Sequence, residues 1–424
     1  MAPYKKTILK NGLRFITIPM KNANSVTVLI LVGTGSKYET KDINGISHFL
    51  EHIFFKGTTK RPSTLNISET LDMVGGEYNA FTSKEVTGFW AKVDKSHTDV
   101  ALDWISDIFL NSKFDETEME REKGVIIEEM NMYLDTPTAY IGDLWETLLY
   151  GDQPAGWKVI GEKENILSFN RKKVLDYYQS HYSSSNVIVC VAGGIAAKDE
   201  AKIQKYFEKI EKGQAQEKPA VKEVQSQPNV LLHYKKTDQT HFCLGVRAYD
   251  LFDKRRYALA LLSVILGGNM SSRLFIKVRE RNGLAYSIHT STDNSTDTGY
   301  LVTQAGIDHK NLEKSIELIL QEYKDLKTKK ITERELQKAK DYLKGTTSLS
   351  LDSSDTQASF YAAQELLEKN ILTPQEKFKK IDAVTVADIK KIAEDIFVPE
   401  KLNLAVIGPV EEKDSARLKQ LLKL

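Results

Sequence analysis

Three residues near the start of the chain, His48, Glu51 and His52, could together bind a metal ion and move a proton. Their spacing is H-x-x-E-H, and at about 100° per residue an α-helix places all three side chains on one face. Two imidazoles four residues apart can close on one Zn²⁺. The carboxylate between them is then close enough to the metal to take a proton from water. The spacing therefore predicts a zinc site with Glu51 as the general base.

A zinc site needs a third protein ligand, and residues 120–133 offer candidates. Steps of three and four residues place five side chains on one stripe of a helix: Glu122, Val125, Ile126, Glu129 and Tyr133. Carboxylates on an apolar stripe indicate that something inside the protein receives them. This pattern favours Glu129 as the ligand and Glu122 as a carboxylate that holds a ligand histidine, whereas Glu128 points away toward solvent. Cobalt or manganese would also accept these ligand types.

Hydrophobic patterns predict the elements that position these residues. Strands are expected at 13–18, 25–32 and 186–192, and two more within 77–94 with a turn near Ser83. Helices are expected at 45–56, 67–74, 96–111 and 116–133. Gly57 is typical of the residue that ends a helix, so the H-x-x-E-H segment lies within the first of these helices.

The second half of the chain repeats this order of elements. Strands are expected at 230–234, 240–247, 286–291, 299–307 and 402–407, with helices at 255–266, 312–326 and 333–343. Residues 211–228 are polar, with two prolines and four glutamines, which is typical of a linker. We therefore predict two homologous αβ domains, 1–212 and 229–424, joined by a linker at 213–228.

The composition excludes several classes of protein. The 424 residues are 41% hydrophobic and 28% charged, which is typical of a globular chain and not of a disordered one. A net charge of +1 gives no support for a nucleic-acid or anionic-lipid partner. Cys190 and Cys243 lie in apolar runs, so we expect buried free thiols and a reducing compartment. No apolar run approaches the roughly 20 residues that span a bilayer, and a cytoplasmic protein without a membrane partner is expected.

The histidine-containing motif and the acidic motif together resemble those of a known family. H-x-x-E-H followed by E-x₆-E resembles the inverted-motif zinc peptidases, which include pitrilysin, insulin-degrading enzyme and the mitochondrial processing peptidase. Residues 45–58 closely resemble the processing-peptidase branch. The resemblance implies that His48, His52 and Glu129 bind one Zn²⁺ per chain and that Glu51 is the general base. Glu122 matches an additional acid of the family near the site.

Two further segments resemble substrate-binding parts of that family. Residues 75–82 resemble the strand that pairs with the substrate backbone, and Asn79 and Ala80 leave a small, polar edge where an extended peptide could add. Arg279 and Tyr286, seven residues apart, resemble a pair that contacts the substrate carbonyl or the tetrahedral intermediate. A cation and a phenol can both donate hydrogen bonds to a developing oxyanion.

The resemblance also implies a fold and an assembly. We expect an α+β chain of two homologous domains, each a mostly antiparallel sheet packed by helices, that forms half of a clamshell chamber. Because this chain carries both motifs, a homodimer is favoured, and an unlike partner subunit stays open. The predicted function is a zinc-dependent endopeptidase that hydrolyses unfolded peptides or oligopeptides inside the dimer chamber. Two alternatives are a non-catalytic structural or assembly subunit of the same fold and a maturase dedicated to one small peptide.

Overall fold

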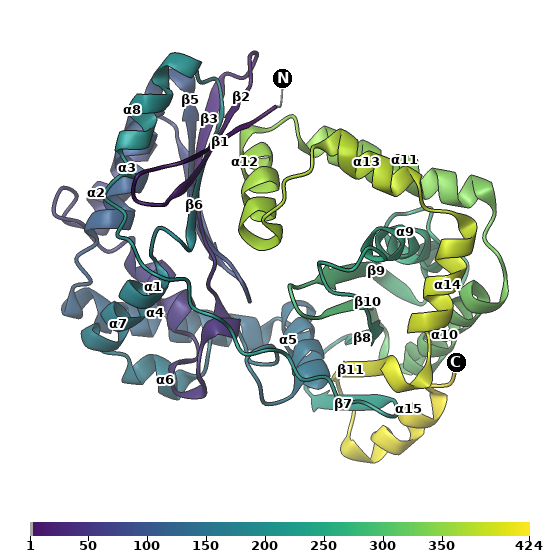
Figure 1. Ribbon diagram of the computed structural model, residues 1–424. Coiled ribbons are helices and arrows are strands. Elements are labelled where there is room, and N and C mark those ends of the chain that lie inside the picture. The colour runs from purple at the N-terminus through teal and green to yellow at the C-terminus, as the bar shows by residue number, and fades with distance from the viewer. Residues whose placement is uncertain (1–2) are drawn as a thin grey trace. The chain divides into compact units, whose positions relative to one another are not determined.

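The computed structural model describes residues 3–424 and divides into two compact units, each with one β-sheet and its helices (Figure 1). Unit 1 consists of Met1–Asn131, Trp157–Pro219 and Ser348–Thr373. Unit 2 consists of Met132–Gly156, Ala220–Thr347 and Pro374–Leu424. Both sheets are mostly antiparallel, so the predicted α+β class with two sheet-and-helix units is confirmed.

The sheet of unit 1 has six strands in the order β1-β2-β6-β3-β5-β4. The strands are β1 (Lys5–Ile8), β2 (Arg14–Pro19), β3 (Ser25–Val32), β4 (Glu77–Thr82), β5 (Thr87–Asp94) and β6 (Val187–Gly193). β2 and β6 are parallel, and the other neighbours are antiparallel. Every residue of β6 is buried, as expected for an apolar, β-branched strand with packing on both faces. β4 lies at one edge of the sheet.

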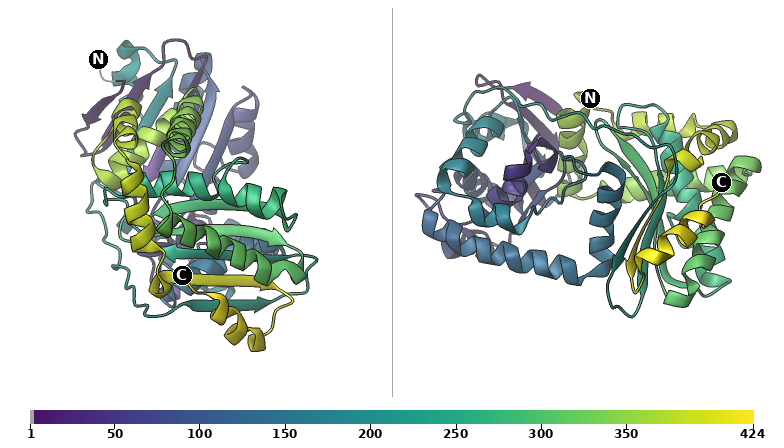
Figure 2. Two further views of the ribbon diagram at one scale, coloured as in Figure 1. Left: turned by 90° about the vertical axis from the view of Figure 1, so that its right-hand side faces the viewer. Right: turned by 90° about the horizontal axis from the view of Figure 1, so that it is seen from below.

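The sheet of unit 2 repeats this topology with five strands in the order β7-β11-β8-β10-β9. The strands are β7 (Asn229–Tyr234), β8 (Thr240–Arg247), β9 (Ala285–Asn294), β10 (Gly299–Ile307) and β11 (Leu402–Gly408). Here too one pair is parallel, β7 with β11, and Figure 2 shows the yellow β11 beside the teal β7. The order matches β2-β6-β3-β5-β4 strand by strand, which supports the predicted duplication.

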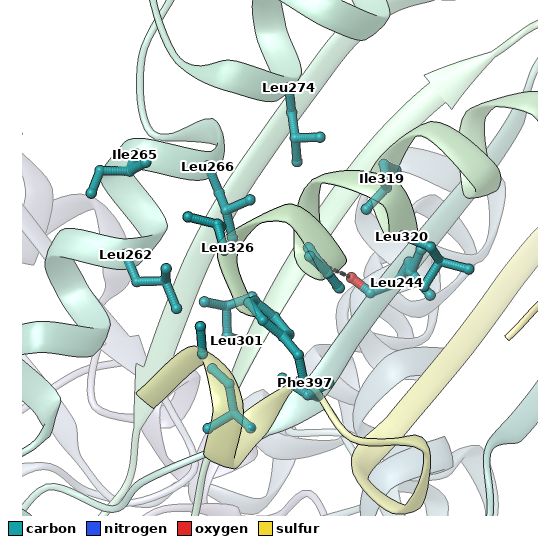
Figure 3. Close-up of a cluster of buried hydrophobic side chains, with 14 of the residues drawn as sticks. Leu244, Leu262, Ile265, Leu266, Leu274, Leu301, Ile319, Leu320, Leu326 and Phe397 are labelled. Carbon is teal, nitrogen blue, oxygen red and sulfur yellow. Dashed lines mark hydrogen bonds between the residues drawn. The ribbon is translucent and has the colours of Figure 1, made fainter. Parts of the chain in front are cut away.

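Helices bury the apolar core against one face of each sheet. Unit 1 contains α1 (Ile46–Ile53), α2 (Thr64–Asp72), α3 (Thr98–Asn111), most of α4 (Glu116–Asp135), α6 (Lys163–Ser168), α7 (Arg171–His181) and α8 (Glu200–Lys205). Unit 2 contains α9 (Arg256–Gly267), α10 (Leu312–Thr328), most of α11 (Glu333–Ser350), α13 (Pro374–Asp382), α14 (Val386–Ile396) and α15 (Ser415–Leu421). Figure 3 shows part of the core of unit 2, where Leu244, Leu262 and Ile319 belong to one buried cluster.

The other face of each sheet is covered by a helix from the opposite half of the chain. α12 (Ser354–Ala363) packs on β3 and β6 of unit 1 (Figure 1). Its Tyr361 belongs to the buried cluster that contains Cys190. α5 (Pro137–Tyr150) packs on β8 and β11 of unit 2, where Trp145 joins the cluster that contains Cys243. The packing of each helix on the sheet of the other half of the chain was not predicted, because periodicity identifies the apolar face of a helix but not the sheet against which it packs.

Other features of the chain agree with the sequence. Cys190 and Cys243 are free and buried, as predicted. Residues 211–228 form no helix or strand, as expected of a linker. The division into homologous domains at 213–228 stays a prediction, because compactness does not test common ancestry. Among the described residues, no helix is both long enough and apolar enough to cross a membrane.

Because α5 and α12 each pack on the sheet of the other half of the chain, we can predict how the chain responds to a single cut. If a protease site inserted near Gly213 is cleaved, the two fragments are expected to co-elute in size-exclusion chromatography under native conditions. Each fragment carries a helix that is packed on the other fragment's sheet, and separation would expose the buried Trp145 and Tyr361 to water. The same cut sample in denaturant should give two separate peaks. Separation in native buffer would contradict this packing.

Candidate metal centre

The start of α1 is fixed by a buried carboxylate. Glu39 accepts hydrogen bonds from the N–H groups of Gly45 and Ser47, both at 2.8 Å, and from the Asn44 side chain at 2.9 Å. These donors include N–H groups at the helix N-terminus that lack intrahelical partners. Burial raises the pKa of Glu39, although the four hydrogen-bond contacts with these residues oppose the rise. Glu39 was missed in the sequence because its partners are mainly backbone groups, which leave no motif.

Gly45 allows the chain to enter α1 at this point. Its φ is +100°, a left-handed backbone conformation that residues other than glycine rarely adopt. A Cβ atom there would lie 2.7 Å from the carbonyl oxygen of Ile160. The sequence therefore places a glycine where both the turn and the close packing require one, directly before α1 and three residues before His48.

The three predicted metal ligands converge on one point. His48 and His52 lie on α1, and Glu129 lies on α4. Glu129 Oε2 is 3.7 Å from His48 Nε2 and 3.4 Å from His52 Nε2. One ligand atom from each residue lies within 4.8 Å of the others, and no other group of this kind occurs among the described residues.

The donor set fits Zn²⁺. Glu129 Oε2 is buried and has no hydrogen-bond partner within residues 3–424, although it faces the nitrogens of His48 and His52. A buried carboxylate oxygen without a partner is costly unless a cation satisfies it. Two imidazole nitrogens and one carboxylate oxygen are a typical ligand set of catalytic zinc sites, which keep one position open.

A second carboxylate orients one of the ligand histidines. Glu122 Oε1 lies 2.8 Å from His52 Nδ1, and Glu122 Oε2 lies 2.5 Å from Lys56 Nζ. Burial alone would raise the pKa of Glu122, but His52 and Lys56 lower it, so the group is a carboxylate at neutral pH. It can therefore accept the Nδ1 proton of His52 and leave the Nε2 lone pair for a metal. Lys56 was not predicted, although its position four residues after His52 could have indicated it.

The two histidines differ in charge when no metal is bound. Burial lowers the pKa of His48 to about 4, so this imidazole is neutral at pH 7. Burial also opposes the charging of His52, but its contacts with Glu122 and Glu129 outweigh burial and raise its pKa to about 9. Because a metal binds the neutral imidazole, binding must displace a proton from His52.

The exposure expected along α4 is found at Glu122 and Glu128 but not at two other positions of the stripe. Glu122 is buried at 4% exposure and Glu128 is exposed, both as predicted. Val125 and Tyr133, however, are 52% and 39% exposed. α4 is therefore covered less completely than a full stripe would require, and the helix face around Val125 meets solvent.

Glu51 lies beside the triad at the edge of a pocket. Its Oε2 accepts a hydrogen bond of 2.5 Å from the hydroxyl of Thr82 on β4. Burial raises the pKa of Glu51, and the Thr82 hydrogen bond opposes that rise. The pocket has a volume of about 280 Å³ and is lined by Glu51, His52, Phe55, Lys56, Tyr78, Asn79, Ala80 and Glu122. A carboxylate with a raised pKa at an open pocket is suited to accept a proton.

The edge strand β4 presents unpaired backbone groups. The N–H of Ser83 donates to the carbonyl of Val86 at 2.8 Å, which sets the alternation of the β4–β5 hairpin. By that alternation the backbone groups of Tyr78, Ala80 and Thr82 point away from β5, toward the open edge. The N–H of Ala80 is bonded instead to Asn79 Oδ1 at 2.8 Å. Asn79 and Ala80 thus lie at an edge that borders the pocket.

Arg279 and Tyr286 are neighbours in unit 2. Arg279 lies in the π-helical turn Phe275–Glu280, and Tyr286 lies on β9. The Arg279 guanidinium carbon is 5.1 Å from the centre of the Tyr286 ring and 4.8 Å from that of Phe275. Tyr286 is 77% exposed, so its hydroxyl is accessible. The two side chains predicted to act together are therefore in contact.

Comparisons with known proteins cover nearly the whole chain. Residues 14–162 match the family described as Insulinase (Peptidase family M16), and residues 168–343 match the Peptidase M16 inactive domain. The chain is 38% identical over 408 residues to the Uncharacterized zinc protease YmxG of Bacillus subtilis, covering 96% of this chain and 98% of that protein. It is 32% identical over 424 residues to an uncharacterized zinc protease of Streptomyces coelicolor, covering 98% and 91% respectively.

Solved structures share the fold. A protease from Helicobacter pylori superimposes with a TM-score of 0.89 at 24% identity, covering 96% of this chain and 99% of that one. The family match and the zinc-protease relatives identify a metalloprotease, and His48, His52 and Glu129 form a group that could hold a metal ion. The chain belongs to peptidase family M16. The resemblance stated from its motifs is confirmed, and the names of its relatives support the use of zinc.

Proposed function

We propose that the chain is a zinc-dependent endopeptidase for unfolded peptides, with one Zn²⁺ per chain held by His48, His52 and Glu129. The observation that carries this proposal is the convergence of His48 Nε2, His52 Nε2 and the buried Glu129 Oε2, which makes no hydrogen bond within the described residues, beside the pocket of Glu51. When bound, Zn²⁺ would supply Lewis acidity, which polarises a carbonyl and makes water more acidic.

Glu51 is the proposed general base and then the general acid. Its carboxylate takes a proton from the attacking water and returns that proton to the leaving amine. Its burial supports this role, because a carboxylate whose pKa is raised holds a proton more readily than one in water. The contact with Thr82 leaves Glu51 Oε1 free of hydrogen bonds within the described chain.

The substrate is proposed to bind as an added strand at β4. The outward backbone groups of Ala80 can pair with an extended peptide, whose carbonyl would replace Asn79 Oδ1 as the acceptor of the Ala80 N–H. Peptides in folded proteins have their backbone groups engaged and should be poor substrates. This mode of binding favours unfolded peptides or oligopeptides.

Arg279 and Tyr286 are the proposed oxyanion donors. Both are hydrogen-bond donors of suitable type, and Tyr286 is exposed for contact with a substrate. Because the resemblance implies four such units around a chamber, we propose that two copies of this chain associate as a homodimer. The free thiols of Cys190 and Cys243 support a reducing compartment such as the cytoplasm.

The proposal is tested with a library of quenched fluorescent peptides and a folded control protein. Cleavage of the peptides, its loss on chelation and its return with added zinc are expected, with the folded protein left intact. Sedimentation of the same sample should give the mass of two chains. Cleavage that persists after zinc is removed would contradict the zinc-dependent function, and a monomer that cleaves at full rate would contradict the dimer.

Glu122→Gln is expected to weaken zinc binding by about 10- to 100-fold, the usual effect of losing a carboxylate that holds a ligand histidine. The amide would no longer balance the charge of Lys56, and its oxygen is a weaker acceptor for His52 Nδ1. Competition with a chromophoric chelator measures the affinity. Glu118→Gln, on the same helix but paired with Arg121 at the surface, is the control. Unchanged affinity in Glu122→Gln would rule out this role.

A further inference from the structure

We propose that Thr82 is a positioning residue that aims Glu51 and links the general base to the strand that docks the substrate. This inference rests on the proposed function, in which Glu51 is the base and β4 the docking edge. The hydroxyl of Thr82 donates to Glu51 Oε2 at 2.5 Å. Among the described residues, the Glu51 carboxylate has no other hydrogen-bond partner, so this single contact determines its orientation.

The side chain and the backbone groups of Thr82 point in different directions because of its place on β4. Alternate side chains of the strand, those of Tyr78, Ala80 and Thr82, are half-buried, whereas Glu77, Asn79 and Phe81 are exposed. The half-buried side is the one that packs against α1, which carries Glu51. By the hairpin alternation, the backbone groups of Thr82 point to the open edge. A docked peptide can therefore pair with the backbone of the residue whose side chain holds Glu51.

The end of β4 is held firmly enough to serve as a reference point. The N–H of Ser36 donates to the carbonyl of Ser83 at 3.2 Å, and the N–H of Lys37 donates to the carbonyl of Lys84 at 2.9 Å. The N–H of Ser83, the next residue after Thr82, donates to the carbonyl of Val86 at 2.8 Å. Because these backbone contacts fix the strand end, the hydroxyl of Thr82 has a defined position and can hold the Glu51 carboxylate in one place.

A general base works only when its carboxylate lies within hydrogen-bond reach of the proton it takes. A glutamate has three side-chain torsions, so without Thr82 the Glu51 carboxylate can turn away from the pocket. The metal ligands make no contact with Thr82 that would be lost. The expected defect therefore lies in turnover and not in metal binding.

The test compares Thr82→Val, Thr82→Ala and Thr82→Ser in the full chain loaded with zinc. Val and Ala are expected to lower kcat by about 10- to 50-fold with KM within about twofold, because alignment of the base contributes to the chemical step. Ser keeps the hydroxyl and should restore kcat to near the wild-type value. Zinc content should be unchanged in all three variants.

The matched control is Thr7→Val, because Thr7 also donates to a glutamate, Glu200, from the opposite edge strand β1. Its kcat should equal that of the wild type. Wild-type kcat in both Thr82→Val and Thr82→Ala would overturn the proposal, and so would a loss that Ser does not restore or that follows lost zinc. Glu51→Gln in parallel separates the two proposals. If Glu51→Gln still cleaves peptides, the proposed function and this inference both fail. If Glu51→Gln is inactive but Thr82→Val and Thr82→Ala cleave at the wild-type rate, this inference alone fails.

Discussion

Glu51→Gln is expected to lower kcat for peptide cleavage by about 10²- to 10⁴-fold while leaving the zinc content unchanged. The amide has the size of the carboxylate and can still accept the hydrogen bond of Thr82, but it cannot take a proton from water. Glu51 does not belong to the group of converging ligand atoms, so the metal should remain. Cleavage rate and zinc per chain are measured on the same preparation.

Glu128→Gln is the control for this variant, since Glu128 is exposed on α4 next to a ligand and should behave as the wild type. A Glu51→Gln protein that cleaves at the wild-type rate would remove Glu51 from the mechanism. Loss of zinc together with activity would instead assign Glu51 to the metal and not to proton transfer.

Glu129→Gln is expected to weaken zinc binding by about 100-fold or more and to abolish cleavage at limiting zinc. The substitution replaces the charged oxygen that faces His48 and His52 with a neutral amide, which is a poor zinc ligand. The metal-free variant should also be somewhat less stable than the metal-free wild type, because Glu129 Oε2 lies 3.4 Å from His52 Nε2 and helps to raise the pKa of His52. Chelator competition and thermal unfolding of the metal-free protein measure the two effects.

Glu128→Gln serves again as the control, one residue away on the same helix. Wild-type zinc affinity in Glu129→Gln would show that the third ligand is another group. A loss of stability much larger than the loss of one contact with His52 explains would show that Glu129 has a further structural role.

The part of the site that could be predicted from the sequence is the part carried by short segments. His48, Glu51 and His52 lie within two turns of one helix, so their spacing alone places them on one face. Glu122 and Glu129 were identified because two carboxylates share a stripe of α4. The same stripe misplaced Val125, since periodicity gives the direction of a side chain but not whether another element covers it.

The residues that were missed act through contacts distant in the chain. Thr82 meets Glu51 across 31 residues, and Glu39 binds backbone N–H groups that any sequence would offer. The exchange of α5 and α12 between the sheets is likewise a tertiary feature. The positions of the buried strands along the chain, in contrast, were predictable, because apolar β-branched runs ending in glycine mark β6 and β11.

The most direct test of the central claim is a titration of zinc into the chelator-stripped protein while peptide cleavage is followed. The account predicts no cleavage before zinc is added, a linear rise, and saturation at about one zinc per chain, as expected for one set of three protein ligands. Full cleavage by the stripped protein, or a folded chain that binds no zinc, would contradict the account.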